Sequence, residues 1–291
     1  MNKTKFTVAI SCYNIEKYVE RAMNSVLNQT FTDYELIIVD DCSTDKTMEI
    51  VKNIEKENIK IYNTEKNSGT AGATRNIAID KANGEYIIFL DGDDCLYDEN
   101  TLKNINEIIE NNIYDIIYLG YESVGADGST LRLSNSENST RKERLICDTS
   151  FSVSSKCWNT NFLRENNLKF KEGMYYEDEL FSIKANILAK HTIFGEIPIF
   201  KYFRNRDGSV MTKPTIKKCS DWYRMLAEVT DLYTITPEED RKYLLSFIKN
   251  ENDSIPLRIE NILEALQENR ITKVLPKRNY KFKKLSDNEN L

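Results

Sequence analysis

The feature that most constrains the fold is an alternation, along residues 1–120, of short apolar runs with amphipathic stretches. Residues 35–39 (ELIIV) and 85–90 (EYIIFL) are apolar at nearly every position, which is typical of strands covered on both faces. Between such runs, apolar residues recur at helical spacing. Repeated strand–helix units of this kind predict an α/β fold with a doubly wound, mostly parallel, Rossmann-like sheet.

The expected elements follow from the same patterns. Strands are predicted at 7–11, 35–39, 59–62, 85–90 and 114–119, and helices at 15–27, after Ser43 or Thr44, at 71–82 and at 99–111. Residues 122–150 are expected to form loop or ribbon, 177–190 a helix, and 193–203 one or two strands. Beyond residue 214 the pattern is helical, with one stripe of Trp222, Met225, Leu226, Val229 and Leu232 and a further helix at 255–267 that Ser254 caps.

The length suggests one large domain, or one domain plus an appendage. We expect a domain at 1–213, with halves at about 1–120 and about 121–213. A C-terminal helical region with a basic tail follows at 214–291.

Composition excludes several classes of protein. Lys and Arg total 40 against 46 Asp and Glu, a net charge of −6, which argues against a nucleic-acid partner. No apolar run has the length of a membrane helix, and the apolar patch near the N-terminus predicts a first strand rather than a signal peptide. The six cysteines include no CxxC pair, which favours reduced thiols and a cytoplasmic location.

Polar clusters follow three of the predicted strands where each strand ends. They are Tyr13-Asn14, Asp40-Asp41 and Asp91-Gly92-Asp93-Asp94. In doubly wound sheets, ligands bind beyond the carboxyl ends of the strands. We therefore expect these clusters to line one crevice.

The pair Asp91 and Asp93 has the chemistry of a metal site. Two carboxylates on one side of a tight turn, which Gly92 permits, are hard ligands suited to Mn²⁺ or Mg²⁺ shared with a substrate diphosphate. The simpler alternative is a turn that is rich in Asp only because it is solvated. The position of the pair directly after a buried strand favours a metal site instead.

Other candidates each have a simpler structural explanation. Asp40 and Asp41 could accept from a base or ribose, although Ser43, Thr44 and Asp45 are ordinary helix-capping residues. Arg75, in the segment that Gly69 opens, could face phosphate or only form a surface ion pair. Arg204 and Arg206 could clamp phosphate. Glu177 and Asp178 could simply complement a helix dipole.

With these motifs in order, the chain resembles family 2 glycosyltransferases of the GT-A fold, of the bacterial surface-polysaccharide type. The resemblance covers about residues 5–210, and it implies that the half at about 1–120 binds the nucleotide and the half at about 121–213 binds the acceptor. It rests on residues 11–14 (SCYN), 39–45 (VDDCSTD), 67–69 (NSG), Arg75-Asn76, 91–94 (DGDD), 156–159 (KCWN), 176–179 (YEDE) and 202–204 (YFR). The family often has a proline before the tyrosine of the first motif, where this chain has Ser11-Cys12.

The resemblance implies inverting, metal-dependent transfer of a sugar from a nucleotide-diphosphate donor, expected to be a UDP-sugar, to a glycan or lipid-linked acceptor. It implies that Asp91 and Asp93 serve a Mn²⁺ or Mg²⁺ ion and that Asp178 is the base. The acceptor side is assigned to Trp158 and Glu177. The donor side is assigned to Tyr13, Asn14, Asp40, Asp41, Gly69, Arg75, Asp91, Gly92 and Arg206.

Alternatives remain open from the sequence alone. A catalytically silent nucleotide-sugar or carbohydrate-binding protein on the same fold would carry the same motifs. Residues 270–284 interleave basic and apolar side chains, which suggests peripheral contact with the inner face of the cell membrane, or merely a solvated tail. The helices at 217–268 could instead form a homodimer contact.

Overall fold

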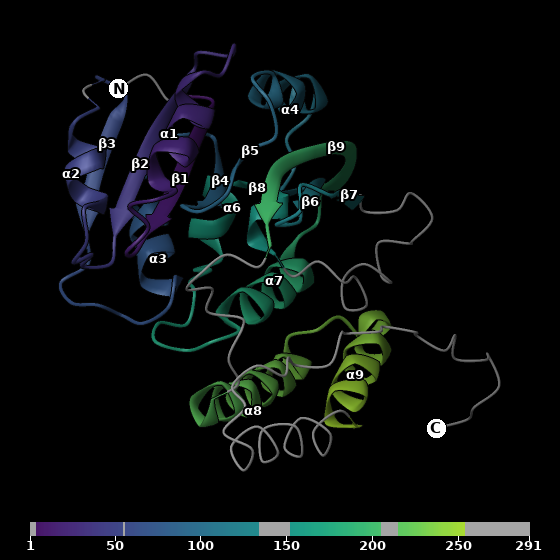
Figure 1. The fold of residues 1–291 in the computed structure, drawn as a ribbon. Coiled ribbons are helices and arrows are strands. Elements are labelled where there is room, and N and C mark those ends of the chain that lie inside the picture. The colour runs from purple at the N-terminus through teal and green to yellow at the C-terminus, as the bar shows by residue number, and fades with distance from the viewer. Residues whose placement is uncertain (1–3, 55, 134–151, 205–214, 254–291) are drawn as a thin grey trace.

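The computed structural model describes residues 4–54, 56–133, 152–204 and 215–253, and it has the α/β architecture that the sequence predicts. Strand–helix alternation occupies the N-terminal part (Figure 1). Its elements are β1 (Phe6–Cys12), α1 (Val19–Leu27), β2 (Tyr34–Asp40), α2 (Thr47–Lys52), β3 (Ile59–Asn63), α3 (Gly72–Lys81), β4 (Tyr86–Asp91), β5 (Cys95–Leu96) and α4 (Thr101–Ile109).

The later elements vary more in length. They are β6 (Ile116–Val124), β7 (Thr130–Leu133), a 3-10 turn (Val153–Ser155), β8 (Lys156–Asn159), α6 (Thr160–Glu165), α7 (Glu177–Leu188), β9 (Thr192–Phe203), α8 (Ile216–Asp231), a second 3-10 turn (Leu232–Thr234) and α9 (Glu238–Asp253). The predicted helix at 255–267, its cap Ser254 and the basic segment 270–284 lie outside the described residues.

Within the described residues, nine strands form one sheet in the order β3-β2-β1-β4-β8-β6-β9-β5, with β7 paired to β6. The first four of these strands are mutually parallel, and β9 is parallel to β6. The short strand β8 runs antiparallel between β4 and β6. The sheet is therefore mostly parallel, as predicted, with antiparallel pairings confined to its second half.

Alternate residues of the central strands supply two separate cores. On one face, Phe6, Val8 and Ile10 of β1 pack with α1, α2 and α4. On the other, Ala9 of β1 packs with side chains of α3, α6 and α7. Both faces of the sheet are covered, which explains why these strands are apolar throughout.

Helix α7 has two apolar faces. Phe181 and Ala185 face the sheet, whereas Ile183 and Ile187 face a third core built with α8 and α9. Figure 1 shows α8 and α9 on the side of α7 away from the sheet. The predicted stripe is confirmed, since its four side chains on α8 and Leu232, directly after this helix, are all buried. The division at residues 213 and 214 stays a prediction.

Several boundaries differ from those expected. The strand predicted at 114–119 is β6 and continues to Val124, where it forms a hairpin with β7 in the segment predicted as loop or ribbon. Residues 193–203 belong to one strand, β9, whose pairing with β6 has a register shift near Gly120. The helix predicted from residue 15 begins at Val19, and residues 16–18 form a turn before it.

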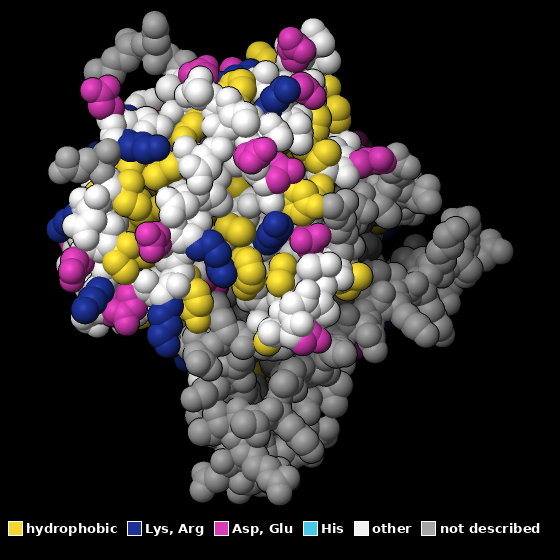
Figure 2. Space-filling model, turned by 45° about the horizontal axis from the view of Figure 1, so that its top comes forward, with side chains coloured by type: hydrophobic (Ala, Val, Ile, Leu, Met, Phe, Trp, Pro, Cys, Tyr) yellow, Lys and Arg dark blue, Asp and Glu magenta, His cyan; other side chains and the backbone are white. Residues whose placement is uncertain are grey.

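The surface shows no segregation by charge on the face in view in Figure 2, where acidic and basic side chains are interspersed with apolar ones. Exposed large apolar side chains such as Tyr13 and Ile113 lie in separate connecting segments, after β1 and after α4. Isolated apolar side chains of this kind are normal on soluble domains. None of the helices in the described part of the chain combines the length and apolar character that a membrane crossing requires.

Candidate functional site

The ends of three parallel strands bring the predicted clusters to one edge of the sheet. In the β1–β2 register Cys12 lies opposite Asp40, and in the β1–β4 register Ser11 lies opposite Asp91. The residues that follow these strands therefore leave the sheet side by side. This is the convergence that the sequence predicts for a doubly wound fold.

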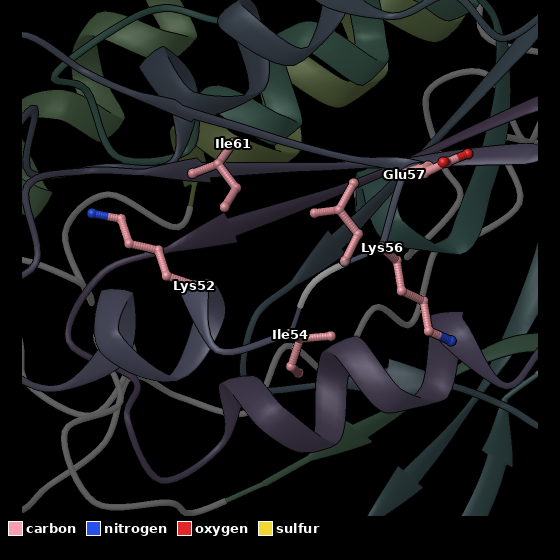
Figure 3. A pocket seen from close by; sticks show the side chains of 6 residues that line it. Lys52, Ile54, Lys56, Glu57 and Ile61 are labelled. Carbon is pink, nitrogen blue, oxygen red and sulfur yellow. The ribbon is translucent and has the colours of Figure 1, made fainter.

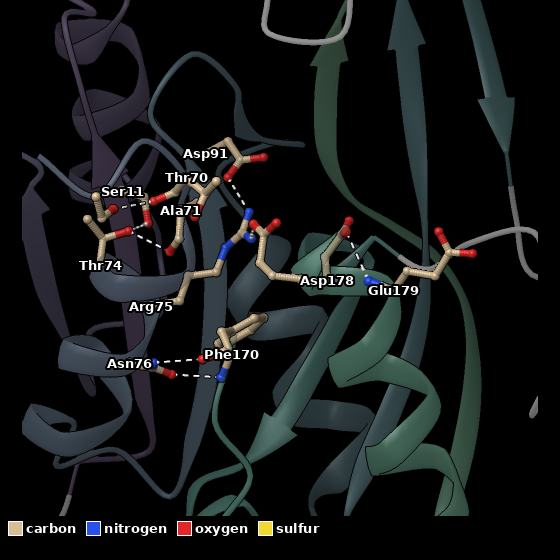
Figure 4. A network of polar contacts seen from close by, with 12 residues as sticks. Ser11, Thr70, Ala71, Thr74, Arg75, Asn76, Asp91, Phe170, Asp178 and Glu179 are labelled. Carbon is tan, nitrogen blue, oxygen red and sulfur yellow. Dashed lines mark hydrogen bonds and ion pairs between the residues drawn. The ribbon is translucent and has the colours of Figure 1, made fainter. Parts of the chain in front are cut away.

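Arg75 links this edge to the start of α7. Its Nη2 donates to Asp91 Oδ1 at 2.8 Å and its Nη1 donates to Glu177 Oε1 at 3.0 Å. Arg75 and Glu177 are buried, whereas the Asp91 side chain is 43% exposed. Figure 4 shows Arg75 reaching from α3 toward Asp91, with Asp178 nearby. Segments that are far apart in the sequence thus share one guanidinium.

The charges around Arg75 do not balance. Burial lowers the pKa of Arg75, but Asp91, Glu177 and Asp178 outweigh that effect and raise it. Burial raises the pKa of Glu177 above its ordinary value; Arg75 opposes the shift and Asp178 adds to it. Three carboxylates around one cation leave excess negative charge, and the most buried carboxyl is the one that holds a proton most readily.

An aromatic ring supports the same guanidinium. Arg75 Cζ lies 5.4 Å from the ring centroid of Phe170, and this ring stacks on Phe181 of α7 at 3.9 Å. The Nε of Arg75 is buried and has no hydrogen-bond partner. No sequence motif singles out Phe170; its place in the apolar pair Leu168 and Phe170 is the only signal that the sequence offers.

The turn at Asp91-Gly92-Asp93-Asp94 packs tightly on β1. A Cβ on Gly92 would lie 2.8 Å from the main-chain oxygen of Ser11 and 2.3 Å from Ile15 Cδ1, and Gly92 N donates to Ser11 O at 3.1 Å. Glycine is required here for close approach, not for an unusual φ. The turn closes with Asp94 N donating to Asp91 O at 2.9 Å.

The carboxylates of this turn differ in access. Asp91 is partly exposed, whereas Asp93 is 6% exposed. No group of three or more Asp, Glu, His or Cys side chains that could hold a metal ion occurs in the described ranges. The two carboxylates are of the kind that Mn²⁺ or Mg²⁺ prefers, and Asp91 is the more accessible of them.

Asp178 lies in the first turn of α7. This helix begins after Tyr176, whose φ of 66° is left-handed, so the chain reverses sharply just before the acidic residues. Asp178 Oδ1 accepts from Glu179 N at 2.9 Å, and the side chain is partly exposed. A carboxylate in this position can reach a ligand from solvent.

Asn14 and Asp40 organise the turns beyond β1 and β2. Asn14 Oδ1 accepts from Thr44 N at 2.8 Å, and Asn14 N donates to Ser43 Oγ at 2.9 Å. The buried carboxylate of Asp40 accepts from both the main chain and the hydroxyl of Ser43. These bonds hold the turn that precedes α2. The prediction that Ser43 or Thr44 caps this helix is wrong, because its N-cap is Lys46, whose side chain makes no capping hydrogen bond. Tyr13, beside this pair, is 48% exposed.

Asp41 faces a different loop. Its carboxylate accepts from Thr64 Oγ1 at 2.8 Å and from the main chain and hydroxyl of Ser68 at 3.0 Å. Gly69, with a φ of +76°, follows directly, and a Cβ there would meet no atom within 4 Å. Asp41 and Gly69 thus shape the loop that leads into α3.

The two residues assigned to the acceptor side, Trp158 and Glu177, both have partners within the protein. Trp158 is fully buried, its Nε1 donates to Val153 O at 3.0 Å, and its ring packs on Phe181. This placement argues against a contact between Trp158 and an acceptor, because the ring belongs to the core. The Glu177 carboxylate accepts a hydrogen bond from Arg75 Nη1 at 3.0 Å. Arg206 lies outside the described residues.

A shallow groove occurs elsewhere, at the edge of the sheet. Figure 3 shows side chains that line it, among them Lys52 and Lys56 near α2 and Ile61 on β3. None of the predicted site residues lines this groove. Its chemistry is therefore separate from that around Arg75.

Comparisons with known proteins agree with this geometry. The family model described as glycosyl transferase family 2 matches residues 7–183. Poly(ribitol-phosphate) beta-N-acetylglucosaminyltransferase TarS of Staphylococcus aureus (strain MW2) is 32% identical over 229 residues, covering 76% of this chain and 39% of that protein. Poly(ribitol-phosphate) beta-glucosyltransferase of Bacillus spizizenii is 32% identical over 217 residues, covering 72% of this chain and 33% of that protein.

Among solved structures, residues 1–349 of S. aureus TarS in complex with UDP-GlcNAc superpose with a TM-score of 0.71 and 28% identity. The match covers 86% of this chain and 73% of that one. The mannosyltransferase PcManGT of Pyrobaculum calidifontis, 14% identical with a TM-score of 0.58, shares the fold. This chain spans about two fifths of the full length of TarS.

Proposed function

The chain belongs to glycosyl transferase family 2, and we therefore propose that it transfers a sugar from a nucleotide-diphosphate donor to an acceptor hydroxyl. The donor is a UDP-sugar, as in the TarS complex with UDP-GlcNAc. The acceptor is a glycan or a lipid-linked polymer of the cell surface, in keeping with the poly(ribitol-phosphate) in the names of two relatives.

The observation that carries this proposal is the bridge that Arg75 makes between Asp91 and Glu177. It joins the turn expected to hold the donor diphosphate to the helix that presents Asp178. The donor and the base must lie on opposite sides of the reacting carbon. Arg75 bonds both to the turn after β4 and to the start of α7, so it fixes the distance between the elements that carry them.

In the proposed reaction, Asp178 removes the proton from an acceptor hydroxyl. The hydroxyl oxygen then bonds to the anomeric carbon from the face opposite the diphosphate. The bond from that carbon to the diphosphate oxygen breaks, so the configuration inverts and no covalent enzyme intermediate forms. The leaving diphosphate departs with the electron pair of the broken bond.

The other residues hold the donor. Asp91 and Asp93 would bind Mn²⁺ or Mg²⁺, which supplies positive charge to the departing diphosphate. Arg75 orients Asp91 and adds its own charge. Tyr13, whose ring is exposed at the edge of the sheet, offers a surface on which a nucleotide base can stack. Asn14, Asp40 and Asp41 act through the turns that they hold.

A direct test uses the purified full chain with Mn²⁺, UDP-GlcNAc or UDP-glucose, and poly(ribitol-phosphate) as the first acceptor. We expect release of UDP together with a gain of sugar on the polymer for one donor. A thermal-shift screen of other UDP-sugars extends the test, because a donor that binds only the folded state raises the melting temperature.

The silent-binding alternative makes the opposite prediction. A carbohydrate-binding protein on this fold would show a thermal shift with a UDP-sugar but neither transfer nor hydrolysis of the donor. That result across a panel of donors and acceptors would reject the enzymatic proposal. A peripheral membrane contact through residues 270–284 and a homodimer stay predictions; flotation with anionic liposomes and sedimentation test them.

A further inference from the structure

We propose that Arg21, on α1, is a positioning residue for the turn that carries Asp91 and Asp93. This inference rests on the proposed function, because it assigns Arg21 to the residues that set the donor-binding turn. Arg21 Nη2 donates to the main-chain oxygen of Asp93 at 2.5 Å. The same guanidinium lies 3.6 Å from the ring centroid of Phe203, at the end of β9.

A second bond ties Phe203 to the same turn. Phe203 N donates to Asp94 Oδ1 at 3.1 Å, and Asp94 is almost fully buried. Arg21 and Phe203 thus form a closed set of contacts with Asp93 and Asp94. The set joins three segments that are more than seventy residues apart, since the bonds span 72 and 109 residues.

The rest of the turn is held by other elements. Gly92 lies against Ser11 of β1, and Asp91 is bonded to Arg75 of α3. Arg21 therefore supplies the contact from α1 to a turn that β1, α3 and β9 also hold. A main-chain oxygen fixed on Asp93 limits the directions that its side chain can take, and that is how Arg21 acts on the donor site.

Arginine suits this position better than lysine. A guanidinium is planar, so it can stack on an aromatic ring and donate in its own plane at the same time. An ammonium group can donate to the Asp93 oxygen but cannot stack. Arg21 is exposed, so truncating its side chain leaves no buried cavity. An effect of the substitution on ligand binding can therefore be separated from an effect on folding.

The test compares Arg21→Ala, Arg21→Lys and the control Lys17→Ala, which removes a positive charge from the exposed segment just before α1. Calorimetry measures the binding of UDP in the presence of Mn²⁺. We expect Arg21→Ala to bind UDP about tenfold more weakly, the scale of one charge-assisted hydrogen bond. Arg21→Lys should fall between that variant and the wild type, and Lys17→Ala should match the wild type.

A second measurement needs neither metal nor donor. Urea unfolding of Arg21→Ala, Phe203→Leu and the double variant forms a cycle that isolates the contact between the two side chains. We expect the two substitutions to be coupled, so that the double variant is less destabilised than the sum of the single ones. Additive effects would overturn the inference, whatever the chain catalyses.

The binding results separate the two proposals. If the wild type binds UDP but Arg21→Ala binds it as tightly as Lys17→Ala does, Arg21 does not position the turn and the inference fails alone. Full affinity in Arg21→Lys would also reject it, because charge without stacking would then suffice. If the wild type binds no nucleotide diphosphate with Mn²⁺, the proposed function fails and takes this inference with it.

Discussion

At the scale of single residues, Arg75 has the most demanding surroundings. It forms hydrogen bonds with Asp91 and Glu177, and it also interacts electrostatically with Asp178. One cation cannot fully compensate three carboxylates in a poorly solvated place. Burial raises the pKa of Glu177, Arg75 opposes this rise, and the negative charge of Asp178 adds to it.

This charge arrangement predicts how stability depends on pH. The ordinary pKa of a glutamate is 4.5, and the folded protein holds the Glu177 proton to a higher pH than the unfolded chain does. The free energy of unfolding should therefore fall as the pH rises from 4.5 through the raised pKa, by about 1.4 kcal/mol for each pH unit that separates the folded and unfolded pKa values. Urea unfolding between pH 4.5 and 8 measures the fall.

The variant Glu177→Gln isolates the effect. It keeps an oxygen for Arg75 but cannot ionise, so its free energy of unfolding should change less with pH than that of the wild type. The matched control is Glu165→Gln, at an exposed position at the end of α6. Equal pH dependence in all three proteins would show that the Glu177 pKa is not raised.

Asp178 makes a prediction about catalysis. Asp178→Asn keeps the shape of the side chain but removes the carboxylate that we propose as the base, so we expect donor binding to persist while transfer falls by about 10²-fold or more. Calorimetry with the donor and a single-turnover assay measure the two quantities. Turnover near that of the wild type in this variant would refute the assignment of the base.

The roles of single residues can be predicted from the sequence only in part. The meeting of the segments after β1, β2 and β4 follows from strand ends and is predicted by the pattern. The bonds of Arg75 to Asp91 and Glu177 are not, because they depend on where α3 and α7 lie. The orientation of Asp41 toward Thr64 and Ser68 does not follow, because the partners of a carboxylate depend on how a distant loop folds. Trp158 was assigned to the acceptor, yet it fills the core between the sheet and α7.

At the scale of elements, α3 is fastened to the segment that precedes α7. Asn76 Nδ2 donates to Phe170 O at 3.0 Å, and its Oδ1 accepts from Phe170 N at 2.8 Å. A Cβ on Gly72 would lie 2.8 Å from the main-chain oxygen of Lys171. Figure 4 shows both bonds of Asn76 to Phe170. This contact holds Phe170 beneath Arg75.

Removing the contact should cost stability. Asn76→Ala leaves two main-chain groups of Phe170 without partners, so we expect a loss of about 2 kcal/mol in the free energy of unfolding. Asn76→Asp keeps an acceptor for Phe170 N but sets a carboxylate against Phe170 O and Glu172 Oε1, to which Asn76 Nδ2 donates at 3.0 Å, so it should be at least as destabilised. Urea unfolding measures both variants. An unchanged free energy of unfolding in Asn76→Ala would mean that these bonds contribute nothing.

The elements that the sequence predicted are those with a strong apolar period. β1, β2, β4 and α4 were found because each buries a regular pattern of side chains. β5 and β8 were not predicted, since they have two and four residues. Such short strands exist only because neighbours offer free edges, as β4 and β6 do for β8. That information is tertiary, and no local pattern carries it.

At the scale of the whole molecule, α7 belongs to two cores at once. Its sheet-facing side packs on Phe170 and Trp158, and its outer side packs with Met225 and Trp222 of α8. The helix that presents Asp178 is therefore held from both directions. The C-terminal helices and the sheet share this one element and should melt together.

A substitution far from the site tests that cooperativity. Met225 is fully buried, so Met225→Ala should remove about 2–5 kcal/mol of stability by creating a cavity. Calorimetric melting should show one transition at a lower temperature. Leu245→Ala, at an exposed position on α9, is the control. Two separate transitions would instead support an independent C-terminal domain.

The crowding of acids around Arg75 also has a consequence for ligand uptake. A diphosphate that binds beside Arg75, as proposed, competes with Glu177 for the same positive charge. The pKa of Glu177 then rises further, and its carboxyl takes up a proton from the buffer. Donor binding should then consume hydrogen ions near neutral pH. Titrations in buffers with different heats of ionisation count them, and Glu177→Gln should abolish the difference between buffers.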